Sequence, residues 1–361
     1  MARLRTVSPN SRGWTRRRAG RGFVYLDDDG QRLPAEDVER IRALAIPPAW
    51  KDVWICPYPS GHIQAVGTDD AGRRQYLYHP DWRVKRDRMK FDRVSEAARK
   101  LPDARKQVLE HLGLEGMPLE RASAAAVRLL DLGYFRIGSD AYADANGSFG
   151  LTTLEKRHVR ARKGRLVFCF TGKSGIEHCI EIDDGHVMTA LERMRKRRGG
   201  GDRLLAYQNS RTWSVLDAAS VNLYLRELLA GDLTAKDFRT WHATVIAATA
   251  LAMSDEPGDT KRSRQRAVKA AVQEVSEYLG NTPTIAKNSY IDPRVIDLYE
   301  DGTTIGHVAR KAHSSPDVRQ AELERAVLEM LAADGSDSAA RAIRSRARKT
   351  SPRRAVTGTR G

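Results

Sequence analysis

The hydrophobic pattern of the chain changes character near Phe91, and this change constrains the fold more than any other sequence feature. Between Gly22 and about Pro80, short β-type runs are broken by Asp-Gly, Pro and Gly turns, and one helix is predicted over Ala35 to Leu44. From about Phe91 onward, apolar residues recur three and four positions apart, which is typical of helices packed by one face. The pattern predicts an α+β protein.

The first part is predicted to be a small antiparallel β-rich N-terminal domain over residues 21–90, and the second a larger, mainly α-helical domain over 91–333. The predicted helical domain also carries a β-hairpin, formed by Arg165–Phe170 and Ile176–Ile182 around a glycine-rich turn that places Lys173 at an exposed tip. Its predicted later helices are Asp217–Leu229, Arg239–Met253, Arg262–Leu279 and a short one over Thr284–Ile291.

The two ends of the chain are rich in arginine and poor in apolar residues. We therefore expect a flexible basic arm over residues 1–20 and a disordered basic tail over 334–361. The formal net charge is +16, which makes a nucleic acid the first expectation for a partner, although a soluble protein with a basic tail gives the same balance. The longest apolar stretch, near Ala243 to Met253, is too short to span a bilayer, so we expect a soluble cytoplasmic protein.

Three cysteines and two glycine-rich segments offer no site that fits a known pattern. Cys56, Cys169 and Cys179 are odd in number, which argues against a disulfide framework, and they lack the spacing of a zinc site, so they are interpreted as strand residues. Gly172-Lys173-Ser174 lacks the preceding glycine of a P-loop, and Gly199–Gly201 lacks a dinucleotide-binding spacing. No metal or cofactor is expected.

Four residues that suit phosphodiester transfer occur in the helical domain: Arg136, Lys173, Arg239 and Tyr290. A phenol with an ordinary pKa of about 10 is a weak nucleophile at neutral pH, and nearby cations favour its ionised form. Planar guanidinium groups match the equatorial oxygens of a phosphoryl transition state. The set therefore indicates transfer of a phosphodiester to Tyr290.

The chain closely resembles the type IB DNA topoisomerases, particularly the compact poxviral and bacterial group, over roughly residues 20–310. The resemblance rests on several segments, which are Ile46–Trp54, Arg73–Tyr76, Phe135–Gly138, Asn146–Leu154 and Ser289–Tyr290. It implies an enzyme that relaxes positive and negative supercoils by cutting one strand of duplex DNA and resealing it, without ATP or metal.

The resemblance also implies a role for each site residue. Tyr290 looks like the nucleophile that takes a DNA 3′-phosphate, Arg136 and Arg239 look like the residues that grip its oxygens, and Lys173 looks like the acid that protonates the departing 5′ oxygen. The poxviral and eukaryotic members have a histidine nine residues before the tyrosine, where this chain has Asn281. An amide donates a neutral hydrogen bond, so its expected share of phosphate stabilisation is smaller.

Four further positions match DNA contacts of the family: Gln75, Tyr76 and Tyr78 in the β-rich domain and Tyr142 in the helical one. Packing across strands is the alternative reading of these aromatic and amide side chains. The family lysines near Tyr142 are replaced here by Ser139 and Ala141, which puts the contacts of that loop in question. By resemblance, the chain is expected to clamp double-stranded DNA as a monomer in the nucleoid.

Two other functions compete with this one. A tyrosine site-specific recombinase shares the arginine, the hairpin lysine and the terminal tyrosine, but it usually has histidine where this chain has Lys236, and its N-terminal domain is helical. A non-catalytic nucleoid-binding protein explains the charge, but it does not need a tyrosine aligned with two arginines and a lysine.

Overall fold

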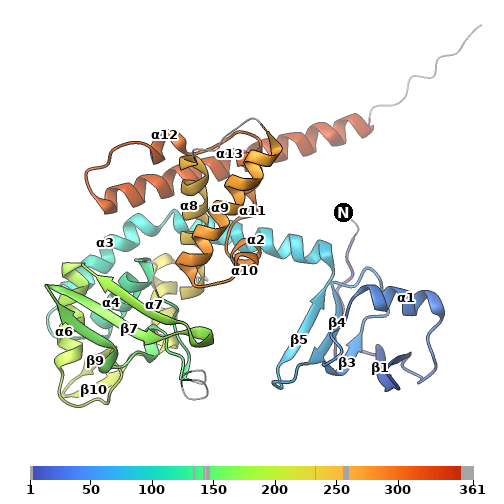
Figure 1. Cartoon of the computed structure of the whole chain (residues 1–361), viewed down its shortest axis with the longest axis horizontal. Helices are drawn as coiled ribbons and strands as arrows, with labels where there is room; N and C mark the ends of the chain where they lie inside the picture. The colour runs from blue at the N-terminus through green and yellow to red at the C-terminus, as the bar shows by residue number, and fades with distance from the viewer. Residues whose placement is uncertain are drawn as a thin grey trace, which may run out of the picture. The chain divides into compact units, whose positions relative to one another are not determined.

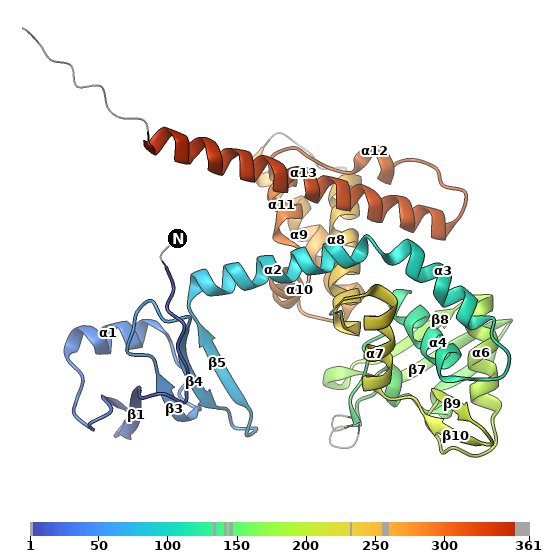
Figure 2. The ribbon, with the colours of Figure 1, turned by 180° about the vertical axis from the view of Figure 1, so that it is seen from behind.

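The computed structural model describes residues 3–132, 135–140, 143, 147–231, 233–254 and 260–350, with side chains except at Ser174 and 335–350. The chain divides into two compact units, Met1–Asp92 and Arg93–Gly361, which are described separately below. Figures 1 and 2 show the strands of the first unit and the helices of the second from opposite sides. The α+β prediction is confirmed.

The first unit is built on a five-stranded antiparallel sheet with the strand order β2-β1-β3-β4-β5. Helix α1 (Ala35–Ala43) supplies the buried Ile41, which packs with Val53, Ile55 and Ala65 of the sheet in one small core. The strands are β1 (Trp14–Ala19), β2 (Gly22–Leu26), β3 (Lys51–Ile55), β4 (Ile63–Thr68) and β5 (Arg74–Tyr78).

Strand β1 corrects the expectation of a flexible arm over residues 1–20. It pairs with β2 from Thr15 to Ala19 and with β3 through Trp14 and Thr15. The guanidinium of Arg16 donates hydrogen bonds to the carbonyl oxygens of Pro47 at 2.6 Å and Trp50 at 2.8 Å. Composition was misleading here because a basic strand can still be ordered when its backbone pairs on both sides and one aromatic ring, that of Trp14, packs on the core.

The second unit is mainly helical, and α4 (Leu119–Asp131) is buried from Arg121 to its end. Just beyond α4, the buried Phe135 packs edge-on against Phe168, with 5.1 Å between ring centroids, and this contact places the next residue, Arg136, beside the hairpin sheet. Helix α2 (Pro80–Ala98) begins in the first unit and ends in the second. The other helices of the second unit are α3 (Leu101–Leu112), α6 (Gly185–Lys196), α7 (Ala218–Leu229), α8 (Ala235–Met253), α9 (Lys261–Leu279), α10 (Pro283–Ser289), α11 (Pro293–Glu300), α12 (Gly306–Ala309) and α13 (Pro316–Thr350).

The predicted hairpin is present as β7 (Arg165–Thr171) and β8 (Glu177–Ile182), and β6 (Val159–Arg162) extends it to three strands. A single 3-10 turn, Lys173–Gly175, joins β7 to β8. A separate hairpin is formed by β9 (Ala206–Asn209) and β10 (Thr212–Val215).

Cys169 and Cys179 form a disulfide, contrary to the prediction of three unpaired cysteines. The two residues lie directly opposite each other on β7 and β8, with 4.3 Å between their Cα atoms. Residues opposite each other in an antiparallel pair approach this closely at the non-hydrogen-bonded positions. Sequence spacing hid the pair because the hairpin register brings together residues that are ten positions apart. Cys56 is free and buried.

Helix α13 also differs from expectation, because its backbone stays helical through Thr350 where a disordered tail from 334 was predicted. The segment is rich in alanine and arginine, two of the strongest helix formers, and this composition outweighs its lack of large apolar residues. Residues 351–361 lie outside the described part of the chain.

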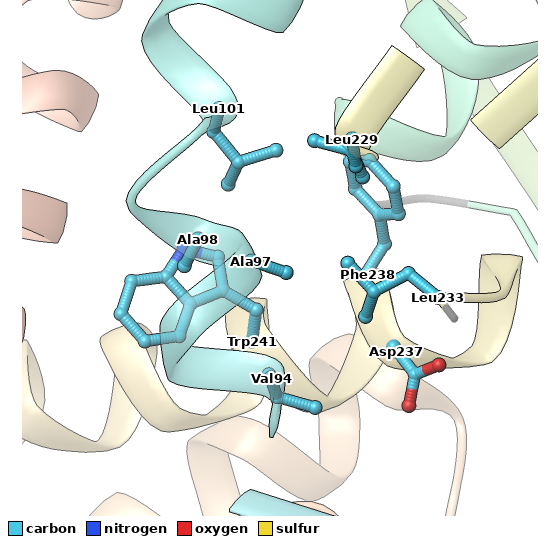
Figure 3. Close-up of a pocket in the computed structure, with 9 residues that line it drawn as sticks. All are labelled: Val94, Ala97, Ala98, Leu101, Leu229, Leu233, Asp237, Phe238 and Trp241. Atoms are coloured by element: carbon cyan, nitrogen blue, oxygen red, sulfur yellow. The ribbon is translucent and has the colours of Figure 1, made fainter. Parts of the chain in front are cut away.

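Within the described residues, no helix is long and apolar enough to cross a membrane, and no group of three or more histidine, cysteine or acidic side chains could hold a metal ion. A cavity of about 20 Å³ lies in the helical unit. This is room for about one water molecule, so the cavity is a packing defect and no ligand site. Figure 3 shows the side chains around it, which are Val94, Ala97, Ala98, Leu101, Leu229, Leu233, Asp237, Phe238 and Trp241.

Candidate active site

Both of the predicted arginines donate hydrogen bonds to the C-terminal end of α9. The helix ends at Gly280, which adopts the left-handed conformation with φ +58°. Arg136 donates from Nη2 to the carbonyl oxygens of Leu279 and Gly280, both at 3.1 Å, and Arg239 donates from Nη2 to that of Leu279 at 2.6 Å. The last carbonyls of a helix lack intrahelical partners and carry partial negative charge, so they attract and fix cations.

Tyr290 lies beside the second of these arginines. Tyr290 is the C-cap residue of α10. The guanidinium carbon of Arg239 lies 5.8 Å from the centroid of the Tyr290 ring. The hydroxyl of Thr244 on α8 accepts from the backbone N–H of Asp292 at 3.2 Å, which fixes the chain just after the tyrosine. The predicted short helix is confirmed, and the tyrosine at its end is buried, with 9% of its surface exposed.

Electrostatics at the tyrosine favour its ionised form. Burial by itself raises the pKa of Tyr290, but the charges of Arg239, Lys236 and Arg136 and the hydrogen bond from Arg239 outweigh it, so the pKa is lowered. Burial and the charge of Arg136 lower the pKa of Arg239 to about 10, so this guanidinium stays charged at neutral pH. The site therefore concentrates positive charge around a phenol.

Asn281 is the fourth residue of the cluster. The orientation of its side-chain amide follows from its hydrogen bond with Arg136. Its Oδ1 accepts from Nη2 of Arg136 at 2.9 Å, and because a guanidinium only donates, the Nδ2 amino group must point elsewhere. Among the residues that the structure describes, Nδ2 of Asn281 and Nε of Arg239 are buried without a hydrogen-bond partner. Buried donors are normally satisfied, so these two nitrogens mark a place for an acceptor such as a phosphate oxygen.

Lys173 is the predicted site residue that lies on the hairpin turn. It begins the turn between β7 and β8, and its side chain is exposed, as the sequence predicted. In the described part of the chain, no hydrogen bond or ion pair joins Lys173 to the arginines or to Tyr290. The structure thus brings together Arg136, Arg239, Asn281 and Tyr290 and leaves the fifth predicted residue at the tip of the hairpin.

The residues predicted to contact DNA in the first unit all lie on β5. Tyr76 and Tyr78 share one face, with rings stacked at 5.9 Å, and guanidinium groups of Arg74 and Arg86 lie over them. Gln75 points to the other face, since side chains alternate along a strand, and its Nε2 donates to Asp69 at 2.9 Å. Tyr142, the fourth predicted contact, lies outside the described residues.

Sequence reasoning did not assign a site role to Lys236 or His178. Lys236 lies three residues before Arg239 on α8, and helical periodicity alone puts the two on one face, so its place near Tyr290 could have been predicted. His178 faces the same cluster from β8, and no local sequence signal indicates this because it depends on the hairpin register.

Comparison with known families identifies the class of protein. Residues 79–308 match the model of the eukaryotic DNA topoisomerase I catalytic core, and residues 22–69 match that of the bacterial DNA topoisomerase IB N-terminal domain. Both models describe one class of enzyme, the DNA topoisomerases, which are isomerases. Since the first match covers more than half of the chain, the chain belongs to the type IB DNA topoisomerase family, within its viral and bacterial group.

Individual relatives are viral and plant proteins. DNA topoisomerase 1B of Acanthamoeba polyphaga mimivirus is 29% identical over 299 residues, which are 80% of this chain and 88% of that protein. DNA topoisomerase 1B of vaccinia virus strain Copenhagen is 22% identical over 250 residues, or 68% of this chain and 75% of that protein. DNA topoisomerase 1 beta of Arabidopsis thaliana is 27% identical over 171 residues, or 47% of this chain and 18% of that protein.

Proposed function

We propose that this protein relaxes positively and negatively supercoiled DNA by cutting one strand through Tyr290 and resealing it, without ATP or metal. The observation that carries the proposal is the gathering of Arg136, Arg239 and Asn281 around the tyrosine, with two buried donors left without partners. A phosphodiester placed against these donors would satisfy them and face the phenol.

In the cleavage step, the phenol oxygen of Tyr290 forms a bond to phosphorus while the bond from phosphorus to the 5′ oxygen breaks. The DNA 3′ end stays on the protein as a phosphotyrosyl ester. The phenol of Tyr290 loses its proton to solvent water, which the lowered pKa favours, and Lys173 gives a proton to the departing 5′ oxygen and takes one back from water. Resealing is the reverse of these transfers. The proposal requires the turn that carries Lys173 to reach the bound phosphate.

The two guanidinium groups stabilise the transition state. Charge builds up on the equatorial oxygens of phosphorus, and donors fixed in advance by the end of α9 meet that charge without further reorganisation. One preorganised donor of this kind is worth roughly 3 kcal/mol of barrier. The phosphotyrosyl ester keeps the energy of the broken bond, so resealing needs no ATP, and protein cations take the role that Mg²⁺ has in many phosphoryl transfers.

The proposal extends to the partner and the assembly. The exposed face of β5, with Tyr76 and Tyr78, supports contact with double-stranded DNA, and Gln75 and Tyr142 are proposed contacts by family resemblance. One chain holds both arginines and the tyrosine of the site, which supports action as a monomer. We propose that it works in the cytoplasm on the nucleoid.

Relaxation of plasmid tests the proposal. Negatively and positively supercoiled plasmids are incubated with the protein, EDTA and no nucleotide, and the reaction is stopped with detergent. We expect relaxation of both and a covalent adduct on the 3′ side of the nick. Tyr290→Phe removes the nucleophile but keeps the ring, so it should abolish both products and preserve DNA binding.

The same assay separates the alternatives. A non-catalytic binder would form no covalent adduct even as the parental protein, so Tyr290→Phe would leave all of its activity unchanged. A tyrosine recombinase would join two duplexes in a synaptic complex. Full relaxation by Tyr290→Phe, or a requirement for two duplexes, contradicts the proposal.

A further inference from the structure

His178 lies where the hairpin meets the end of α9. It pairs with Phe170 across β7 and β8, and its ring stacks on that phenylalanine at 5.3 Å between centroids. A Cβ atom built on Gly172 would lie 2.5 Å from Cδ2 of the imidazole, and one built on Gly280 would lie 3.4 Å from Cε1. The edge of the ring that carries Nε2 therefore packs beside both glycines. Gly172 lies at the base of the turn with Lys173, and Gly280 lies just before Asn281.

This edge faces the same cations as the proposed phosphate site. Arg136 and Arg239 both act on His178 electrostatically, and Arg136 donates to the carbonyl of Gly280, the residue that the ring approaches. No hydrogen bond of the imidazole nitrogens occurs within the described residues. A half-buried imidazole that packs by its faces and leaves its nitrogens unused is available to a ligand.

The charge state of the ring suits such a ligand. Burial and the charges of Arg136 and Arg239 lower the pKa of His178, while Glu177 opposes them, so the ring is neutral in the free protein. A neutral imidazole still has one N–H donor. A bound phosphate brings negative charge between the guanidinium groups and the ring, which offsets their repulsion and makes protonation easier. The ring can therefore meet an anion as a neutral donor or as a cation.

On the basis of the function proposed above, we propose that His178 is a further catalytic residue, which hydrogen-bonds a non-bridging oxygen of the scissile phosphate from the hairpin side. It supplies the imidazole that the neutral Asn281 does not, and it reaches the phosphate from β8 instead of from the segment that precedes Tyr290. Because the ring also contacts Gly172, its bond to the phosphate would bring the base of the turn with Lys173 towards the departing oxygen.

Single-turnover cleavage of a DNA duplex, with the covalent adduct as the readout, tests this role. His178→Phe keeps an aromatic ring on Phe170 and removes both nitrogens, and His178→Ala removes the whole ring. Loss of one preorganised donor to a transition state typically costs about 100-fold in rate, and we expect a fall of that size in both variants. His186→Ala is the matched control, because His186 is exposed on α6 of the same unit, and it should cleave at the parental rate.

A second variant distinguishes chemistry from packing. Asn281→His places an imidazole next to Arg136, so it should restore most of the cleavage rate to His178→Phe, whereas a lost packing contact at the hairpin would not be restored. Parental cleavage by His178→Phe, or a slow His178→Phe that Asn281→His fails to restore, overturns the proposal. If the parental protein itself forms no adduct, the proposed function fails first, so the two failures remain distinct.

Discussion

Arg136 and Arg239 share the carbonyl oxygen of Leu279, and this shared anchor determines how the site can work. Burial disfavours the charge of Arg239, and repulsion from the guanidinium of Arg136 adds to the cost, as the lowered pKa of Arg239 shows. The carbonyls of α9 offset part of this repulsion in the free protein. A bound phosphate would offset the rest, so the arginines are arranged for an anion before it arrives.

Asn281 gives the first prediction at this scale. In Asn281→Ala, Arg136 loses its side-chain acceptor and the site loses a buried donor, so plasmid relaxation should slow about 10-fold or more. Asn281→His should stay active, because an imidazole can also donate from this position. Relaxation by Asn281→Ala at the parental rate would remove the amide from the mechanism.

Lys236 gives a prediction about pH. Only the ionised phenol is a strong nucleophile, and the pKa of Tyr290 is lowered. The cleavage rate should therefore rise with pH, with the midpoint of the rise below about 10, and level off above that midpoint. Lys236→Gln removes one of the cations that lower this pKa, so the midpoint should move to higher pH. Single-turnover rates between about pH 6 and 10 measure it. A midpoint that stays unchanged or falls would show that Lys236 does not act on the phenol.

At the scale of elements, the turn that follows α9 matters as much as the helix. Gly280 stands at φ +58° and the N–H of Asn281 returns to the carbonyl of Ser276, so the helix stops with Leu279 and Gly280 facing the arginines. Any other residue at this position would be strained and would also approach His178.

Gly280→Ala should therefore lower both stability and activity. The positive φ alone should reduce the free energy of unfolding by about 1 kcal/mol, measured by urea denaturation, and displacement of the two carbonyls should slow cleavage further. Gly302→Ala is the matched control, since Gly302 also has a positive φ, at +87°, but nothing surrounds its Cβ position. Equal cleavage rates in the two variants would show that the turn is only structural.

Many of the helices and strands could be predicted from the sequence. The hairpin, α1, α9 and the helix before Tyr290 follow from periodicity and from glycine and proline stops. Strand β1 could not be predicted in this way, because its order depends on neighbours from distant parts of the chain. The disulfide and the place of His178 could not be predicted either, because both depend on the hairpin register, which no local pattern encodes.

At the scale of the whole molecule, charge determines how the protein meets its substrate. The net charge of +16 predicts binding to duplex DNA that weakens steeply with salt, because each neutralised phosphate releases counterions. The Tyr76→Ala/Tyr78→Ala double variant should bind more weakly at every salt concentration and keep nearly the same salt slope, since it removes stacked rings and leaves the cations. Fluorescence anisotropy with a labelled duplex between about 50 and 200 mM salt measures both effects. Unchanged affinity would exclude the exposed face of β5 from the DNA interface.

The position of Lys173 has a consequence for the genome that the protein would act on. A chain that grips phosphates everywhere along a chromosome must not break the strand at each of them. In the free protein the residue proposed to release the leaving strand lies exposed on the turn between β7 and β8, with no hydrogen bond to the described residues proposed to grip the phosphate. On the proposed mechanism, binding of DNA and cleavage of DNA are thus separate steps. A strand is cut only where the bound DNA brings the hairpin turn with Lys173 to the phosphate.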